Sequence, residues 1–171
     1  VDQGVSAATG PRGTHDVVVA RAGATVRGHV GVVTSTGRVI RTHVQDLPSL
    51  PGTAGPVSLA GGAPLGAFVT MERGEVVVGL ASLLPGAPTL ALATASGVIK
   101  RVADEAAPNR DAWEVIRLAE RDVVGGAMPV ADDDELVLLA DDAQLLRFPA
   151  SSVRPQGRAA GGMAGIKLAG G

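Results

Sequence analysis

Five cations in the sequence have the type and spacing to bind a phosphate backbone. Arg41, Arg101 and Arg147 each stand four residues after the end of a short turn, and Arg38 and Lys100 lie beside two of them. Repeated placement predicts a row of charges along one rim, where these groups can donate hydrogen bonds to successive phosphates. The alternative interpretation is that the cations protect exposed strands from pairing with other chains.

A second group of cations lies in a glycine-rich stretch. Arg154, Arg158 and Lys167 fall within residues 143–171, which contain no Asp or Glu. Because glycine lets a backbone approach a phosphate closely, these three residues join the set of predicted phosphate ligands. The alternation in Ile166-Lys167-Leu168 favours an ordered strand over a flexible linker.

The sequence offers no set of residues that could perform catalysis or hold a metal. Cysteine is absent, which excludes disulfides, thiolate ligands and cysteine nucleophiles. The acidic run 132–135 lacks the spacing of a calcium loop and is interpreted as a solvated turn. His15, His29 and His43 are interpreted as surface or hairpin residues without a partner at ligand or catalytic spacing. We therefore expect no catalytic residue, no metal and no cofactor in this chain.

Composition and charge favour a cytosolic β protein. The 171 residues are 46% hydrophobic, and 24 Gly and 11 Pro interrupt the chain often enough to favour short strands joined by turns. No apolar run approaches the roughly 18 residues of a membrane span. The net charge of −2 is uneven, with +3 over residues 1–45, −9 over 46–142 and +4 over 143–171. The chain begins without Met, and we expect it to be a segment of a longer protein.

A pattern of strand, tight turn and strand occurs three times, at residues 32–41, 92–101 and 138–147. An acidic residue precedes each turn residue by 21 or 22 positions, and an apolar triplet follows each by 19 to 23 positions. The acids are Asp16, Glu75 and Asp122, the turn residues are Gly37, Gly97 and Ala143, and the triplets are Val57-Ser58-Leu59, Ile116-Arg117-Leu118 and Ile166-Lys167-Leu168. Glycine accepts a positive φ without steric cost, so Ala143 predicts a different turn type in the third copy.

These spacings predict an all-β fold of propeller-like blades with about four strands each. One domain, residues 1–171, would contain repeats at about 16–59, 75–118 and 122–168. The stretch 111–118 is interpreted as a strand because its apolar residues alternate. Three blades are too few to close a ring, so we expect about three blades of a larger assembly.

Several segments together resemble the C-terminal repeats of the A subunits of type IIA topoisomerases, DNA gyrase and topoisomerase IV. The resemblance runs from about residue 16 to 168 and is most specific in 134–139, 145–148, 152–158 and 161–168, with support from Gly37-Arg38-Val39-Ile40-Arg41 and Gly97-Val98-Ile99-Lys100-Arg101. It implies a β-pinwheel, a six-bladed propeller variant with strands swapped between blades. Its basic rim would bind and bend duplex DNA, with little sequence specificity.

The resemblance also implies the partners of the whole protein. These are duplex DNA, the ATPase B subunit and the remainder of the A subunit, with ATP and Mg²⁺ used by the parent enzyme in the cytoplasm, at the nucleoid, and no membrane. The family's nucleophile is a tyrosine, which this chain lacks. Residues 10–14 depart from the basic loop of gyrase, so the chain looks closer to topoisomerase IV. Two alternatives are a protein-interaction module, favoured by the acidic middle section, and a structural fragment whose DNA surface lies on other blades.

Overall fold

The computed structural model describes residues 18–49 and 62–168, and its regular elements there are short β-strands and 3₁₀ helices. The strands are β1 His29–Thr34, β2 Arg38–His43, β3 Val77–Ser82, β4 Thr89–Thr94, β5 Val98–Val102, β6 Ala112–Glu114, β7 Val124–Val130, β8 Glu135–Leu139, β9 Leu145–Pro149, β10 Pro155–Gln156 and β11 Met163–Ala164. The 3₁₀ helices are η1 Val44–Asp46, η3 Leu65–Ala67 and η4 Ala150–Ser152. The all-β prediction is confirmed, and β6 confirms a strand within 111–118.

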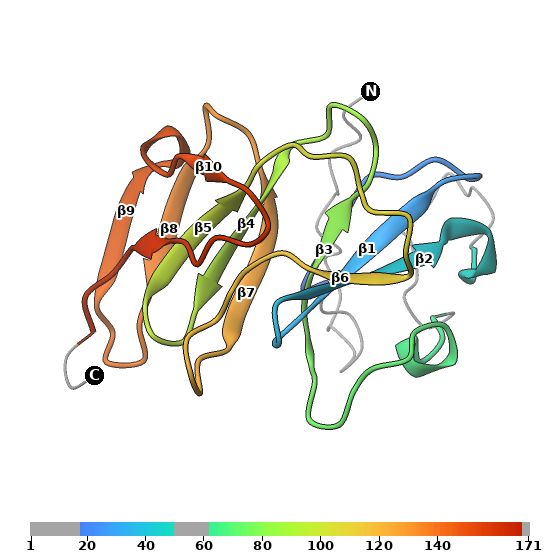
Figure 1. The fold of residues 1–171 in the computed structure, drawn as a ribbon, viewed down its shortest axis with the longest axis horizontal. Coiled ribbons are helices and arrows are strands. Elements are labelled where there is room, and N and C mark those ends of the chain that lie inside the picture. The colour runs from blue at the N-terminus through green and yellow to red at the C-terminus, as the bar shows by residue number, and fades with distance from the viewer. Residues whose placement is uncertain (1–17, 50–61, 169–171) are drawn as a thin grey trace, which may run out of the picture.

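The strands form three sheets that lie next to one another in chain order (Figure 1). The first sheet has the order β3-β1-β2-β6, and the second has β10-β5-β4-β7 with β11 also on β5. The third is the hairpin β8-β9. None of the helices among the described residues is long and apolar enough to cross a membrane.

Each of the first two sheets combines strands that are far apart in the sequence. The β1-β2 hairpin pairs with β3, which follows Glu75, and the β4-β5 hairpin pairs with β7, which follows Asp122. The acid-led strand of one predicted repeat therefore completes the sheet of the hairpin before it. The repeat boundaries in the sequence stay a prediction, and Asp16 and Val57-Ser58-Leu59 lie outside the described residues.

The acidic residues that precede β3 and β7 hold the turns of the neighbouring hairpins. Glu75 accepts hydrogen bonds from Thr34 Oγ1 at 2.6 Å and Thr36 Oγ1 at 2.5 Å. Asp122 accepts from Ser96 Oγ at 2.5 Å and from the Ser96 amide at 3.0 Å. Each acid thus contacts the turn of the preceding hairpin, 39 and 26 residues away, and this contact does not account for the regular spacing to the turn that follows it.

The third hairpin has the same backbone turn, and within residues 18–49 and 62–168 no acid from another repeat accepts a hydrogen bond there. Ala143 has φ 65°, close to φ 78° at Gly37, and its amide donates to Ala140 O at 3.0 Å just as the Gly37 amide donates to Thr34 O. The expectation of a different turn is therefore wrong. The Asp142 side chain accepts from the Gln144 amide at 3.1 Å, so this turn is stabilised locally.

The main core lies between the first two sheets. It includes Val33, Val39, Leu92, Trp113 and Val124, all nearly inaccessible to solvent. Strands β3 and β7 approach so closely there that a Cβ on Gly79 would collide with the Ala127 carbonyl. In the third sheet, by contrast, Val137, Leu139 and Leu145 are more than half exposed.

Candidate nucleic-acid interface

Lys100, one of the predicted phosphate ligands, is completely buried. Its Nζ donates to the carbonyl oxygens of Gly157 at 2.8 Å, Arg158 at 3.0 Å and Ala160 at 2.7 Å. An ammonium has three donors, and all three are used here. Desolvation lowers the pKa of Lys100 to about 8, and the nearby charge of Glu105 opposes this shift. The side chain therefore organises the loop between β10 and β11 and presents no donor to solvent.

Arg101 is buried as well, with 2% of its surface exposed. Its guanidinium donates to Thr89 Oγ1 at 3.0 Å and Ala150 O at 3.2 Å, and it pairs with the exposed carboxylate of Asp132. These partners belong to β4, η4 and the loop before β8, so Arg101 fastens the second sheet to the third hairpin. The desolvation of a buried guanidinium is costly, and these acceptors offset that cost.

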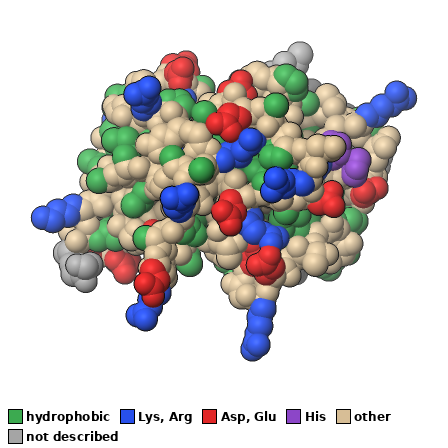
Figure 2. Space-filling view, viewed as in Figure 1, with side chains coloured by type: hydrophobic (Ala, Val, Ile, Leu, Met, Phe, Trp, Pro, Cys, Tyr) green, Lys and Arg blue, Asp and Glu red, His purple; other side chains and the backbone are tan. Residues whose placement is uncertain are grey.

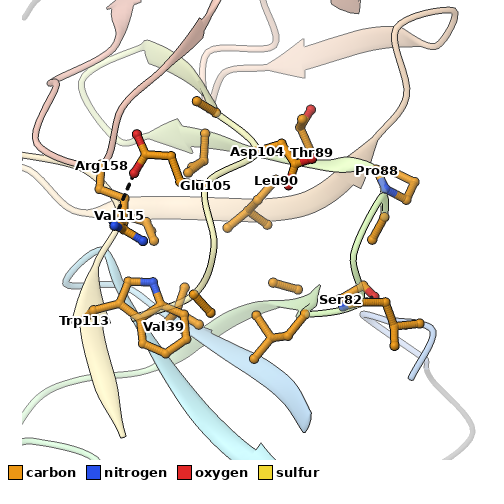
Figure 3. Close-up of a pocket in the computed structure, with 17 residues that line it drawn as sticks. Val39, Ser82, Pro88, Thr89, Leu90, Asp104, Glu105, Trp113, Val115 and Arg158 are labelled. Atoms are coloured by element: carbon orange, nitrogen blue, oxygen red, sulfur yellow. Dashed lines mark hydrogen bonds and ion pairs between the residues drawn. The ribbon is translucent and has the colours of Figure 1, made fainter. Parts of the chain in front are cut away.

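Arg41 and Arg158 are half-buried and tether loops. Arg41 Nη2 donates to Pro108 O at 2.5 Å, and its guanidinium lies 5.5 Å from the centre of the Trp113 ring. Arg158 pairs with Glu105 at 3.2 Å and donates to Ala106 O at 3.0 Å. Figure 3 shows the Arg158–Glu105 pair across a pocket of about 100 Å³ from Trp113. Both cations are engaged within the molecule.

Arg38 and Arg147 are paired with carboxylates. Arg38 contacts both Glu72 and the buried carboxylate of Glu75, and Arg147 contacts Glu135 on the neighbouring strand. The Arg147 pair is well exposed, so its ions can exchange partners at little cost. The cations that follow the three hairpins are thus placed in three different environments, and their alignment in one row stays a prediction.

Arg154 and Lys167 are exposed, and among the residues that the structure describes neither takes part in an ion pair. Lys167 lies next to the β4-β5 turn, because the amide of the preceding Ile166 donates to Gly97 O at 3.1 Å. The turns of the three hairpins, residues 35–37, 95–97 and 141–143, lie along one side of the molecule, the lower edge in Figure 1. We call this side the turn edge, and Lys167 belongs to it.

Arg117 is an exposed cation that sequence reasoning missed. β6 pairs with β2 as β11 pairs with β5, with Trp113 opposite Val39 and Met163 opposite Ile99. Four residues further on, Arg117 and Lys167 therefore hold equivalent positions on adjacent sheets. The amide of Val115 donates to Gly37 O at 2.9 Å, which places Arg117 beside the β1-β2 turn on the turn edge.

The sequence contained a signal for Arg117. It is the central residue of the triplet Ile116-Arg117-Leu118, which aligns with Ile166-Lys167-Leu168. Both triplets have a cation at the centre, but only Lys167 entered the predicted DNA-binding set.

Arg121 is a second missed cation of the turn edge. It has φ 63° where the equivalent turn before β3 has Gly74 with φ 81°. The equivalence follows from matching hydrogen bonds, Asp122 N to Ala119 O and Glu75 N to Glu72 O, both 3.1 Å. Its side chain is 91% exposed and forms only a 3.8 Å pair with Glu120. A left-handed conformation costs an ordinary residue about 1–2 kcal/mol, so Arg occupies a position that favours glycine.

Several comparisons relate this chain to known proteins. A family model described as the DNA gyrase C-terminal domain, beta-propeller, matches residues 32–55 and 134–171. The gyrase A protein of Mycobacterium tuberculosis is 33% identical over 139 residues, which cover 79% of this chain and 16% of the relative. That of Nocardioides sp. is 35% identical over 140 residues, covering 79% and 15%, and that of Staphylococcus aureus is 29% identical over 145 residues, covering 82% and 16%.

Solved structures with the same fold come from both enzymes. The gyrase A C-terminal domain superposes with a TM-score of 0.62 at 20% identity, over 86% of this chain and 46% of that one. The topoisomerase IV C-terminal domain gives a TM-score of 0.67 at 20% identity, over 85% and 45%. This chain spans less than half of either domain and about one sixth of the gyrase A proteins.

The fold is that of a β-pinwheel, a propeller-like assembly of short-stranded blades, as the sequence predicted. The chain belongs to the family of C-terminal domains of type IIA topoisomerase A subunits. The preference for topoisomerase IV stays a prediction, because the sequence relatives are gyrase A proteins while the structures come from both enzymes. Residues 10–14, which carried that preference, lie outside the described residues.

Proposed function

We propose that this chain binds duplex DNA along the turn edge, through phosphate contacts from Arg117, Arg121 and Lys167. The observation that carries the proposal is the pair of equivalent, exposed cations Arg117 and Lys167, each beside a hairpin turn on successive sheets. Cations repeated from blade to blade can follow a curved backbone, which favours bending over base readout. Family membership supports DNA as the partner.

The proposal revises the set of cations predicted from the sequence. Lys167 is kept as a phosphate ligand, and Arg154 is kept as an exposed cation beyond η4. Arg147 is exposed and its pair with Glu135 can exchange partners, so it is kept as a further candidate. Five other cations have intramolecular partners and would support the surface from within; they are Arg38, Arg41, Lys100, Arg101 and Arg158. Buried donors that are already satisfied contribute little to a phosphate because binding would first break their existing hydrogen bonds.

The proposal also covers the role, cofactors, location and partners of the whole protein. The chain would be a non-catalytic part of a topoisomerase that guides the transported DNA segment. The parent enzyme would use ATP and Mg²⁺, in the cytoplasm at the nucleoid. Its other partners would be an ATPase B subunit and the rest of the A subunit.

Fluorescence anisotropy with a labelled duplex, measured over a range of salt concentrations, tests the DNA surface. The variant combining Arg117→Ala, Arg121→Gly and Lys167→Ala should weaken binding at low salt at least tenfold. Its slope of log affinity against log salt should fall by about 3, since each phosphate contact contributes about 0.9. Two duplexes of unrelated sequence should bind equally.

The matched control is Arg110→Ala, which removes an exposed cation from the loop between β5 and β6, away from the turn edge. It should change the slope by less than about 1, the contribution of a single phosphate contact. Equal binding by the triple variant and the wild type would refute the assignment of the turn edge. If Arg110→Ala weakened binding as much as the triple variant, net charge and not position would determine affinity.

A protein-binding role has one observation in its favour. Val137, Leu139 and Leu145 expose an apolar strip on one face of β8-β9, and exposed apolar patches often mark contacts with other protein segments. Leu139→Lys separates the two roles. It should leave DNA affinity unchanged if the turn edge binds DNA, and it should abolish any association that depends on this strip.

A further inference from the structure

His29 and His43 are brought together by the β1-β2 hairpin. They are directly opposite each other in the antiparallel register, and their Nε2 atoms are 3.2 Å apart. The prediction that neither histidine has a partner at ligand spacing is therefore wrong. The hairpin itself contained the signal, since a turn centred on residue 36 places residue 29 opposite residue 43.

The distance between the two Nε2 atoms matches that of two ligands on one metal ion. Imidazole nitrogens bind Zn²⁺ at about 2.0–2.1 Å in a tetrahedral arrangement, which places two of them about 3.3 Å apart. The ring centroids are 4.0 Å apart, and the planes are inclined by 50°. Two imidazoles aimed at one tetrahedral ion have ring centroids about 5 Å apart, so the side chains must rotate, without a change in the strands, to turn both lone pairs towards the ion.

The pair is accessible from solvent. The two histidines form one patch on the surface, the purple side chains in Figure 2. A neutral imidazole has a lone pair for a metal, while a protonated one has none.

We propose that His29 and His43 form a surface site that chelates a divalent transition metal of the Zn²⁺ class. In the metal-free pair, one Nε2–H donates to the other Nε2. When the metal binds, the donor ring moves its proton to Nδ1, so both Nε2 lone pairs coordinate and no proton is lost at neutral pH. The described residues supply no third His, Cys, Asp or Glu to the group, and water completes the coordination shell.

The nature of the two ligands sets the selectivity of the site. Imidazole nitrogen suits Zn²⁺, Ni²⁺ and Cu²⁺, whereas Mg²⁺ requires oxygen ligands. The charge of Arg41 opposes any cation, but its guanidinium is held by Pro108 O and Trp113. The site would join the ends of β1 and β2 away from the β1-β2 turn, independently of the proposed DNA surface.

Isothermal titration calorimetry with Zn²⁺ alone, at pH 7.5 in a non-coordinating buffer, tests the site. The chain should bind one Zn²⁺, and His29→Ala and His43→Ala should each weaken binding at least tenfold. His15→Ala is the matched control and should bind as the wild type does.

Two further measurements guard against misfolded variants and nonspecific binding. Zn²⁺ added to the wild type should shift the imidazole NMR signals of two histidines and leave the third unchanged, while Mg²⁺ should shift none. The proposal is overturned if Zn²⁺ does not bind at millimolar concentration, or if the His29 and His43 variants bind as the wild type does. Equal losses from all three histidine variants would also overturn it.

Discussion

Replacing Glu75 by alanine should be among the most destabilising single changes at the polar positions of the first sheet. The Glu75 side chain is 0% exposed although it precedes a strand at a turn. Its carboxylate accepts from the hydroxyls of Thr34 and Thr36 and from the Glu72 amide at 2.8 Å. The change removes the acceptor that joins β3 to the β1-β2 turn.

The size of this loss of stability depends on which donors to Glu75 can find another acceptor. A hydrogen bond to a charged group contributes about 1.5–3 kcal/mol. The Thr34 hydroxyl can still donate to Arg38 O at 3.3 Å, and the Glu72 amide can bind water. The unpaired Thr36 hydroxyl and the cavity left by the side chain therefore account for most of the loss in the free energy of unfolding. We expect this loss to be about 3 kcal/mol. Asp122→Ala should cost less than half of that, because Asp122 is partly exposed and water can take its place.

Urea denaturation at pH 7, followed by circular dichroism, measures this difference. The m-value should be unchanged, so that the shift in midpoint reports stability alone. Glu120→Ala, which removes an exposed carboxylate from the turn before β7, should unfold close to the wild type. A loss for Glu75→Ala equal to or smaller than that for Asp122→Ala would refute the reasoning.

Three other changes test the remaining electrostatic and backbone features. Partial burial raises the pKa of Asp122, but hydrogen bonds from Ser96, Thr94 and the Val123 amide outweigh it and hold the pKa below its usual range. Asp122 therefore stabilises the fold above about pH 4 and loses this contribution as the pH falls through the folded-state pKa, so thermal melts of Asp122→Asn at pH 2.5–5 should depend less on pH. Above the folded-state pKa of Lys100, which is about 8, the folded chain loses the Lys100 proton while the unfolded chain still retains it. The wild type should therefore gain stability relative to Lys100→Arg between about pH 8 and 10.5. Parallel profiles of stability against pH for the two proteins would contradict this. Ala143→Gly should raise the free energy of unfolding in urea by about 0.5–1 kcal/mol, because it relieves a left-handed alanine at some entropic cost.

Local patterns were sufficient to predict the strands and the turns at Gly37 and Gly97. The alternation of apolar residues and the glycines at positions 37 and 97 are short-range features, and the structure confirms the strands and the positive φ that they imply. Ala143 misled the prediction of its turn because a non-glycine residue can be held in a strained conformation by the strands on either side. The acids were also visible in the sequence, but their hydrogen bonds to the turn of the preceding hairpin were not, since these contacts join different repeats.

The sequence by itself determined an all-β chain of repeated hairpins with cations at regular positions. Only the tertiary structure decided which of those cations are accessible. Lys100 is buried because residues nearly 60 positions later fold over it and offer three carbonyls. Arg117, in contrast, is exposed beside the β1-β2 turn of the first sheet. The charge of a residue is fixed by its type, but its availability to DNA depends on segments that the chain brings together from a distance.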